Sequence, residues 1–246
     1  MKTRRVAAVI PAAGTGRRME AAVPKQFLML GDIPLLLHSL QVFERAASIS
    51  QVILVVPKEE RERTLSEIIE RYSIKKVVKV VAGGATRQES VYHGLKETDP
   101  DAEVVVVHDA VRPFVTEDLI ERSIVAAQKS GGAIIAVPMK ETVKQVGPDG
   151  HILHTVDRAQ LWLAQTPQTF RRALLLEGYQ KAEYDGFQAT DEAAVMERLG
   201  QKVAIVPGRW DNIKITTPED FQMAEAILAG RRNASQADAT QRGLRA

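Results

Sequence analysis

The sequence predicts an α/β protein in which helices cover both faces of a mostly parallel sheet. Short apolar segments rich in Val and Ile alternate with longer segments of helical periodicity. The apolar segments are continuous rather than alternately polar and apolar, which is typical of strands buried on both faces. With 246 residues, of which 45% are hydrophobic, the chain is long enough for one large domain or two small ones.

The first half of the chain predicts five strands with helices between them. We expect strands at residues 6–10, 51–56, 77–81, 103–107 and 133–137, and helices at 34–46, 58–72, 86–96 and from Thr116 to Gly131-Gly132. Three loops follow strands, at residues 12–18, 83–87 and 108–112. Because ligands of parallel sheets bind beyond the carboxyl ends of the strands, we expect these loops to meet at one edge.

The second half predicts a β-hairpin arm and a helical end. Residues 139–157 form two alternating polar and apolar runs around the turn Gly147-Pro148-Asp149-Gly150. Such a hairpin has too little apolar surface to be stable alone, so we expect it to pack on another subunit. Helices are expected at 171–181, 191–199 and 218–228, the last after a cap at Thr217, with short strands at 203–206 and 213–215. Residues 231–246 lack apolar periodicity and are predicted to be a disordered tail.

The composition excludes several classes of protein. The net charge of +2 argues against a nucleic-acid or membrane surface held by bulk charge. The absence of Cys excludes disulfides, thiolate nucleophiles and Cys-ligated zinc. The basic N-terminus has only a brief apolar run that Pro11 breaks, and nowhere do about 18 apolar residues run together. We therefore expect a cytoplasmic enzyme that binds neither nucleic acid nor membrane.

The first predicted strand runs into a loop suited to phosphate. Ala12 to Gly16 carry almost no side-chain bulk, so backbone N–H groups can approach an anion closely. Arg17, Arg18 and Lys25 add the fixed cations that a polyphosphate requires. The segment lacks the Walker pattern, and it has Met19 where a dinucleotide loop needs a third glycine. Taken alone, the Gly-x-Gly pair also fits a plain turn.

The longer string around this loop indicates a family. The run P-A-A-G-T-G-R-R-M at 11–19, followed by P-K-Q-F at 24–27, resembles the signature loop of the sugar nucleotidyltransferases. P-K-Q-F is similar to one branch, the 2-C-methyl-D-erythritol 4-phosphate cytidylyltransferase (IspD) family. Five motifs match in order over about residues 4–229. The resemblance implies a Rossmann-like nucleotidyltransferase fold, with residues 1–230 as a single catalytic domain and 139–157 as a dimerisation arm.

The resemblance also implies a reaction. CMP would pass from CTP to 2-C-methyl-D-erythritol 4-phosphate, which gives 4-diphosphocytidyl-2-C-methyl-D-erythritol and pyrophosphate in the non-mevalonate isoprenoid pathway. The acceptor phosphate would attack the α-phosphorus in line, assisted by Mg²⁺ or another divalent cation. Because this nucleophile is already an anion, no general base is required.

The same resemblance assigns residues to the donor nucleotide. Arg18 and Lys25 are implied as stabilisers of the transition state, although cations on a protein surface more often serve solubility. The implied nucleotide-binding residues are Ala12, Ala13, Gly14, Gly16, Gly83, Gly84, Ser90, Asp109 and Ala110. Asp109 would also meet the metal, directly or through water. From sequence alone, residues 83–90 also fit an ordinary strand-to-helix loop, and Asp109 also fits a helix cap or an ion pair with Arg112. His108 is expected to be structural.

Residues for the acceptor phosphate come only from the resemblance, because their spacing shows nothing. They are Thr142, Arg158, Thr190 and Lys214. The resemblance implies a homodimer in which the hairpin reaches into the partner, so that Thr142 and Arg158 complete the neighbour's site.

Two rival functions remain open at this stage. A sister cytidylyltransferase acting on ribitol 5-phosphate shares P-K-Q-F and H-D-A-V-R-P-F, while residues 189–200 look more like the methylerythritol branch. A non-catalytic nucleotide sensor is the alternative from another class, since fold does not determine function. A sensor has no need of transition-state cations, which disfavours it.

Overall fold

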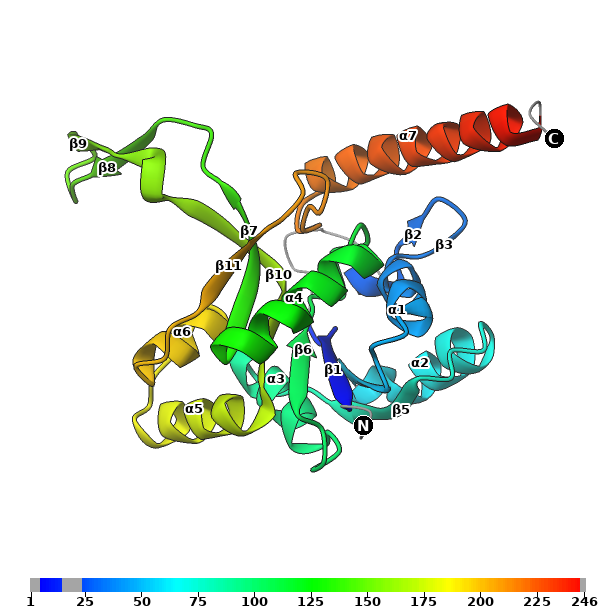
Figure 1. Cartoon of the computed structure of the whole chain (residues 1–246), viewed down its shortest axis with the longest axis horizontal. Coiled ribbons are helices and arrows are strands. Elements are labelled where there is room, and N and C mark those ends of the chain that lie inside the picture. Colours follow the sequence, from blue (N-terminus) through cyan, green and yellow to red (C-terminus); the bar gives the residue numbers. More distant parts are fainter. Residues whose placement is uncertain (1–4, 15–23, 244–246) are drawn as a thin grey trace.

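The computed structural model describes residues 5–14 and 24–243, with side chains through residue 233 (Figure 1). Within these residues a seven-stranded sheet has the order β5–β4–β1–β6–β10–β7–β11. The strands are β1 (Val6–Pro11), β4 (Gln51–Val56), β5 (Val77–Ala82), β6 (Val104–Val107), β7 (Gly132–Pro138), β10 (Trp162–Arg171) and β11 (Ala204–Pro207). All run parallel except β10, which is antiparallel to both of its neighbours. The predicted mostly parallel sheet is confirmed.

Helices cover both faces of this sheet, as predicted. Alternate residues of each strand point to opposite layers, so Ala8 and Ile10 of β1 belong to one core and Ala7 and Val9 to the other. The first core includes α1 (Leu35–Arg45), α4 (Glu117–Ser130) and a helical segment that runs from a 3₁₀ turn (Lys58–Glu60) through α2 (Arg61–Thr64) into a π-helix (Leu65–Glu70). The second includes α3 (Arg87–Lys96), α5 (Arg172–Tyr184) and α6 (Glu192–Arg198).

Two of these helices begin and end where the sequence predicts. The Thr86 side chain caps α3 by accepting from the Glu89 N–H at 3.1 Å, and the Thr116 side chain caps α4 by accepting from the Leu119 N–H at 3.3 Å. Helix α4 ends at Gly131, whose φ of 88° favours glycine.

Strand β10 is the main element that the sequence did not predict. It lies between β6 and β7 in the middle of the sheet, although its sequence contains a proline and several polar residues. The pairing with β7 is irregular between Ala164 and Gln168, which lets Pro167 sit where no ladder hydrogen bond is needed. Contacts with distant residues stabilise β10 in place of a continuous apolar pattern. The Asn212 Nδ2 donates to the Thr166 carbonyl at 2.9 Å, and the Phe170 side chain is fully buried.

The predicted hairpin projects from the body as a separate arm (Figure 1). Strands β8 (Val143–Val146) and β9 (Ile152–Val156) pair with each other in antiparallel register as a two-stranded sheet of their own. Three of its large apolar side chains, Val146, Ile152 and Leu153, are 52%, 61% and 61% exposed. The arm therefore buries little of its apolar surface within one chain.

The C-terminal region differs from the prediction in two places. Residues 213–215 are not a strand, because the Ile215 side chain turns into a small third core and only its N–H bonds across, to the Val111 carbonyl at 2.9 Å. The same core includes Leu30 of a small hairpin formed by β2 (Met29–Leu30) and β3 (Ile33–Pro34).

The closing helix is longer than predicted. Helix α7 (Pro218–Gly243) begins after the predicted cap, where the Thr217 Oγ1 accepts from the Asp220 N–H at 3.3 Å. It continues through residues 231–243, for which composition predicts disorder. This stretch has no proline, and its Ala, Arg and Gln residues have high helix propensity, which allows the helix to extend without apolar periodicity. No helix in the described parts of the chain is long and apolar enough to cross a membrane.

Candidate active site

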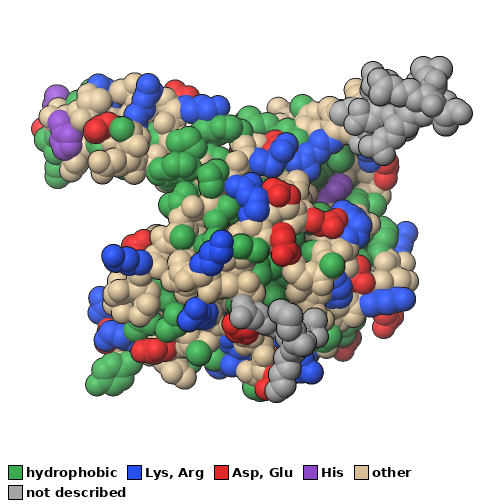
Figure 2. All heavy atoms as spheres, in the orientation of Figure 1, with side chains coloured by type: hydrophobic (Ala, Val, Ile, Leu, Met, Phe, Trp, Pro, Cys, Tyr) green, Lys and Arg blue, Asp and Glu red, His purple; other side chains and the backbone are tan. Residues whose placement is uncertain are grey.

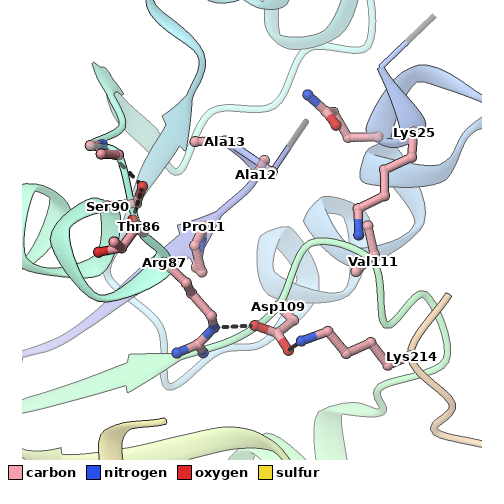
Figure 3. Close-up of a pocket in the computed structure, with 14 residues that line it drawn as sticks. Pro11, Ala12, Ala13, Lys25, Thr86, Arg87, Ser90, Asp109, Val111 and Lys214 are labelled. Carbon is pink, nitrogen blue, oxygen red and sulfur yellow. Dashed lines mark hydrogen bonds and ion pairs between the residues drawn. The ribbon is translucent and has the colours of Figure 1, made fainter. Parts of the chain in front are cut away.

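The candidate site lies where the strand order reverses. From β1 the chain passes to β4 and β5 on one side, and then to β6 on the other, so the loops after β1 and β6 lie side by side. Such a switch point leaves a crevice at the carboxyl ends of the strands. A cavity of about 410 Å³ occupies it, lined by Pro11, Ala12, Ala13, Gly14, Lys25, Gln26, Gly84, Ala85, Thr86, Arg87, Ser90, Asp109, Val111 and Lys214 (Figure 3). The predicted meeting of three loops at one edge is confirmed for their described residues.

Close packing between two loops explains the glycine pair. A Cβ on Gly83 would lie 2.4 Å from the Cβ of Ala13, so no side chain fits there. The Ser90 hydroxyl donates to the Thr86 carbonyl at 2.9 Å and accepts from the Gly84 N–H at 3.1 Å. Ser90 therefore braces the loop from within, and the wall it supports is largely backbone.

Lys25 and Gln26 lie on the opposite side of the cavity. Lys25 opens a 3₁₀ turn (Lys25–Phe27), and its side chain extends into the cavity in Figure 3. Gln26 is 1% exposed, and its side-chain Nε2 is a buried donor with no hydrogen-bond partner in the part of the chain that the structure describes. The sequence alone does not predict a role for Gln26. The predicted residues Gly16, Arg17 and Arg18 lie outside the described residues.

The centre of the site is an ionic cluster around Asp109. Its Oδ1 lies 3.0 Å from the Nε of Arg87, and its Oδ2 lies 2.8 Å from the Nζ of Lys214 and 3.8 Å from the Nε of Arg112 (Figure 3). Burial would raise the pKa of Asp109, but the facing cations Arg87, Lys214 and Arg112 hold that pKa well below its usual range. Asp109 is therefore a carboxylate at any physiological pH. Asp109 therefore lines the cavity and also faces Arg112, the ion-pair partner that the sequence offered as an alternative.

His108 beside it is a core residue. Its ring is fully buried, with Nε2 3.2 Å from the Arg112 carbonyl and Nδ1 3.0 Å from the Thr166 hydroxyl. The carbonyl can only accept, so Nε2 carries the proton and Nδ1 accepts from Thr166. Burial lowers the pKa of His108 to about 4, although Asp109 acts in the opposite direction. A neutral ring with both nitrogens engaged cannot act as a general base.

A second cavity lies beyond the ionic cluster. It has a volume of about 280 Å³ and is lined by Arg87, Asp109, Arg112, Ala164, Gln165, Thr166, Gln168, Thr190, Asp191 and Lys214. Three residues, Arg87, Asp109 and Lys214, line both cavities. Two ligands bound in these cavities would meet at a group of cations, which suits two phosphates that react with each other.

The structure brings together only part of the predicted acceptor set. Thr190 and Lys214 line the second cavity. Thr142 and Arg158 are exposed on the arm and line neither cavity of their own chain. The Arg158 guanidinium donates to the Lys140 carbonyl within the arm. Ala110, expected to contact the nucleotide, is fully buried and also lines neither cavity.

Two charged residues, Arg87 in the ionic cluster and its partner Glu192, were not predicted from the sequence. Arg87 begins α3 after the glycine pair, a position where a cation opposes the helix dipole, and this was the available signal. Glu192 is fully buried and binds the Arg87 guanidinium through both oxygens, at 2.8 Å and 3.0 Å. In the sequence it reads as an ordinary acidic residue in the first turn of a helix, so nothing marked it.

The described residues include no group of three or more His, Cys, Asp or Glu that could hold a metal ion. Mg²⁺ commonly binds through one or two carboxylates together with substrate phosphates, and Asp109 is the one carboxylate among the described residues that lines both cavities.

This combination of fold and site defines a class. A mostly parallel sheet whose switch point carries a small-residue loop, a lysine and two cavities joined by cations suits an enzyme that binds a nucleotide beside a second phosphorylated substrate, as nucleotidyltransferases do.

Comparisons with known proteins identify the branch. A model of the 2-C-methyl-D-erythritol 4-phosphate cytidylyltransferase family matches residues 6–230. The chain belongs to this family. A relative of that name from Syntrophus aciditrophicus is 47% identical over 224 residues, which cover 91% of this chain and 96% of the relative. Another, from Halalkalibacterium halodurans, is 48% identical over 221 residues, 90% of this chain and 96% of the relative.

Solved structures agree with the fold. The 4-diphosphocytidyl-2C-methyl-D-erythritol synthase of Anaerococcus prevotii superposes with a TM-score of 0.82 at 35% identity, over 92% of this chain and 97% of that one. The 2-C-methyl-D-erythritol 4-phosphate cytidylyltransferase of Thermus thermophilus gives a TM-score of 0.74 at 34% identity, over 90% and 98%. The resemblance inferred from the motifs is confirmed.

Proposed function

We propose that this chain transfers CMP from CTP to 2-C-methyl-D-erythritol 4-phosphate, with release of pyrophosphate. Family membership supports the choice of both substrates. The observation that carries the chemistry is the cluster of Arg87, Asp109 and Lys214, which lines both cavities. A phosphate from each substrate would meet there, and the cations would offset the charge that develops during transfer.

The larger cavity takes the CTP. Support comes from its largely backbone walls at Ala12–Gly14 and at Gly84, which can contact a base and phosphates without side chains in the way. Lys25 faces the triphosphate and, with Arg18, stabilises the charge on the α-phosphate and the departing pyrophosphate. The remaining nucleotide-binding residues that we propose are Gly16, Gly83, Ser90, Asp109 and Ala110. Because the Ala110 side chain is fully buried, this residue would contribute through its backbone.

The smaller cavity takes the phosphate of the acceptor. Lys214 and Thr190 are its described donors of the right kind, a cation and a hydroxyl. Thr142 and Arg158 join them from the arm of a second copy, so that the working unit is a homodimer. The exposed apolar side chains of the arm favour this arrangement, because a partner would bury them (Figure 2). The rest of residues 1–230 forms a single catalytic domain.

Asp109 is the residue that would hold Mg²⁺, directly or through water. When bound, the ion supplies positive charge across the triphosphate oxygens. The low pKa of Asp109 keeps this carboxylate ionised for that role. The acceptor phosphate attacks as an anion, so His108 has no proton to remove.

Pyrophosphate release tests the proposal directly. The protein would be given CTP and Mg²⁺ with either 2-C-methyl-D-erythritol 4-phosphate or ribitol 5-phosphate. Release with the first alone supports the proposed reaction, and release with the second alone would keep the chemistry and change the acceptor. Binding of CTP without release in either mixture would favour the nucleotide sensor.

A further inference from the structure

The segment that carries Lys214 has little regular structure to hold it in place. Residues 208–217 belong to no helix or strand. A backbone hydrogen bond joins this segment to the loop that follows Asp109, where the Ile215 N–H donates to the Val111 carbonyl at 2.9 Å. Because the segment is not part of the sheet, side-chain contacts must supply much of what fixes Lys214, a residue that lines both cavities.

One guanidinium on α7 bridges this segment to the loop after Asp109. The Nη2 of Arg231 donates to the Phe114 carbonyl at 3.0 Å and lies 2.7 Å from the Oδ2 of Asp211. The guanidinium also stacks on the Phe114 ring, with its Cζ 4.9 Å from the ring centroid. Phe114 lies on the loop after Asp109, and Asp211 shortly precedes Lys214. One side chain therefore joins the two segments that carry Asp109 and Lys214.

Stability alone is a weak explanation of this bridge, because a half-exposed ion pair contributes little to folding. Burial would raise the pKa of Asp211, but hydrogen bonds from Arg209 and Arg231 hold that pKa below its usual range, so the carboxylate stays charged. Arg209 belongs to the same segment as Asp211 and cannot anchor that segment to another element. Arg231 can, because α7 is anchored separately, with Ala224 fully buried in the third core and Leu228 packed against it.

We infer that Arg231 is a positioning residue that holds the segment carrying Lys214 against the loop after Asp109, and so sets where Lys214 presents its charge to the acceptor phosphate. The family model matches residues 6–230, so membership of the family does not itself assign a role to Arg231. A small displacement of a group that orients a reacting phosphate lowers the rate even when the group itself is intact. The inference rests on the proposed role of Lys214.

The inference predicts a loss that is selective for the acceptor. Arg231→Met keeps an apolar stem beside Phe114 and removes the bridge. The kcat/KM for the acceptor should fall by about fivefold, less than for loss of a direct charged contact, while the KM for CTP changes by less than about twofold. Arg231→Lys should restore most of the kcat/KM, because it keeps a charge beside Asp211. Steady-state pyrophosphate release by the full chain measures these constants.

Two control variants separate this effect from the loss of any surface ion pair. Arg198 is a matched arginine on α6, since it pairs with Asp185 at 2.9 Å, stacks on Phe187 and lines neither cavity. Arg232 follows Arg231 on α7, and its guanidinium pairs with Asp32 at 2.8 Å. Arg198→Met and Arg232→Met should both keep the wild-type kcat/KM for the acceptor.

Hydrogen–deuterium exchange, read by mass spectrometry, tests the bridge without substrates. The peptide that contains residues 211–217 should exchange faster in Arg231→Met than in the wild-type protein, and at the wild-type rate in both controls. This separates the inference from the proposed function. A wild-type protein that releases no pyrophosphate would contradict the proposed reaction, and the exchange rates would still show whether Arg231 holds the segment.

Several outcomes would overturn the inference. They are an unchanged exchange rate in Arg231→Met, an unchanged kcat/KM for the acceptor in an active enzyme, equal losses for the acceptor and for CTP, and equal changes in the two controls.

Discussion

The ionic cluster in the body and the hairpin arm differ in whether their side chains find partners within one chain. In the cluster, Asp109 is 6% exposed and faces three cations from three separate segments. On the arm, Ile152 and Leu153 are each 61% exposed, and Thr142 and Arg158 line neither cavity of their own chain. One chain thus preorganises the ionic cluster by itself, whereas the apolar side chains of the arm stay exposed within one chain. The following predictions test that contrast.

The largest effect is expected in the cluster. Asp109→Asn keeps the shape but removes the charge that faces Arg87, Arg112 and Lys214, so these three cations would repel one another and a divalent cation would lose its carboxylate. We expect kcat/KM to fall by about 10³-fold. Steady-state pyrophosphate release measures this, and the circular dichroism spectrum controls for folding. A fall in kcat/KM of less than about tenfold would show that Asp109 does not hold the metal.

The lysine of the donor cavity should act mainly on the rate. Lys25→Ala should lower kcat by about 10²-fold and change the KM for CTP much less, because the charge it stabilises develops in the transition state. Arg18→Ala should behave alike. Lys58→Ala, at an exposed position, is the matched control. Comparable losses in kcat and in CTP affinity would instead indicate ground-state binding.

The arm should affect the acceptor alone. Arg158→Ala should raise the KM for 2-C-methyl-D-erythritol 4-phosphate by about tenfold, the scale of one lost charged contact, and leave the KM for CTP unchanged. An unchanged acceptor KM would show that Arg158 lies outside the site.

Mixing variants tests whether the arm serves a neighbour. A dimer of one Lys25→Ala chain and one Arg158→Ala chain would contain one site with both residues intact. Co-refolded mixtures should therefore recover about a quarter of wild-type activity, since half of the dimers are mixed and each has one good site. Activity no higher than the mean of the two variants would place Arg158 in its own chain's site.

The smallest effect concerns pH and stability. The pKa of His108 in the folded protein, about 4, lies below its ordinary value of 6.5. The contribution of His108 to the free energy of unfolding is therefore complete above pH 6.5. It is lost as the pH falls toward 4, by about 2–4 kcal/mol in total. Thermal unfolding between pH 7 and pH 4.5 measures this loss.

A variant pair isolates the contribution of His108. His108→Gln should have a flatter dependence of melting temperature on pH over this range, while His151→Gln on the exposed arm should keep the wild-type slope. Carboxylates with lowered pKa values, such as Asp109, begin to act below about pH 5, and they are the same in all three proteins, so the difference in slope reports on His108. Equal slopes in all three proteins would mean that folding does not lower the pKa of His108.

Much of the fold followed from local pattern. Buried strands such as β4 and helix starts such as Thr86 and Thr116 were predicted because continuous apolar runs and hydroxyl caps act over a few residues. Strand β10 was not predicted, because hydrogen bonds with distant segments stabilise it although its own sequence contains a proline and several polar residues. The C-terminal part of α7 was not predicted for the opposite reason. High helix propensity extends the helix there, although the sequence has no apolar periodicity.

The sequence by itself determined the family to which the chain belongs, and it singled out the small-residue loop, Lys25 and Asp109, which line one cavity, because each belongs to a motif of consecutive residues. Only the tertiary structure decided that Arg87 and Glu192, 105 positions apart, form a pair, and that one cluster lines two cavities. Those arrangements depend on which faces the strands and helices turn toward each other. That choice is made by the free energy of packing the whole core, which no short segment encodes.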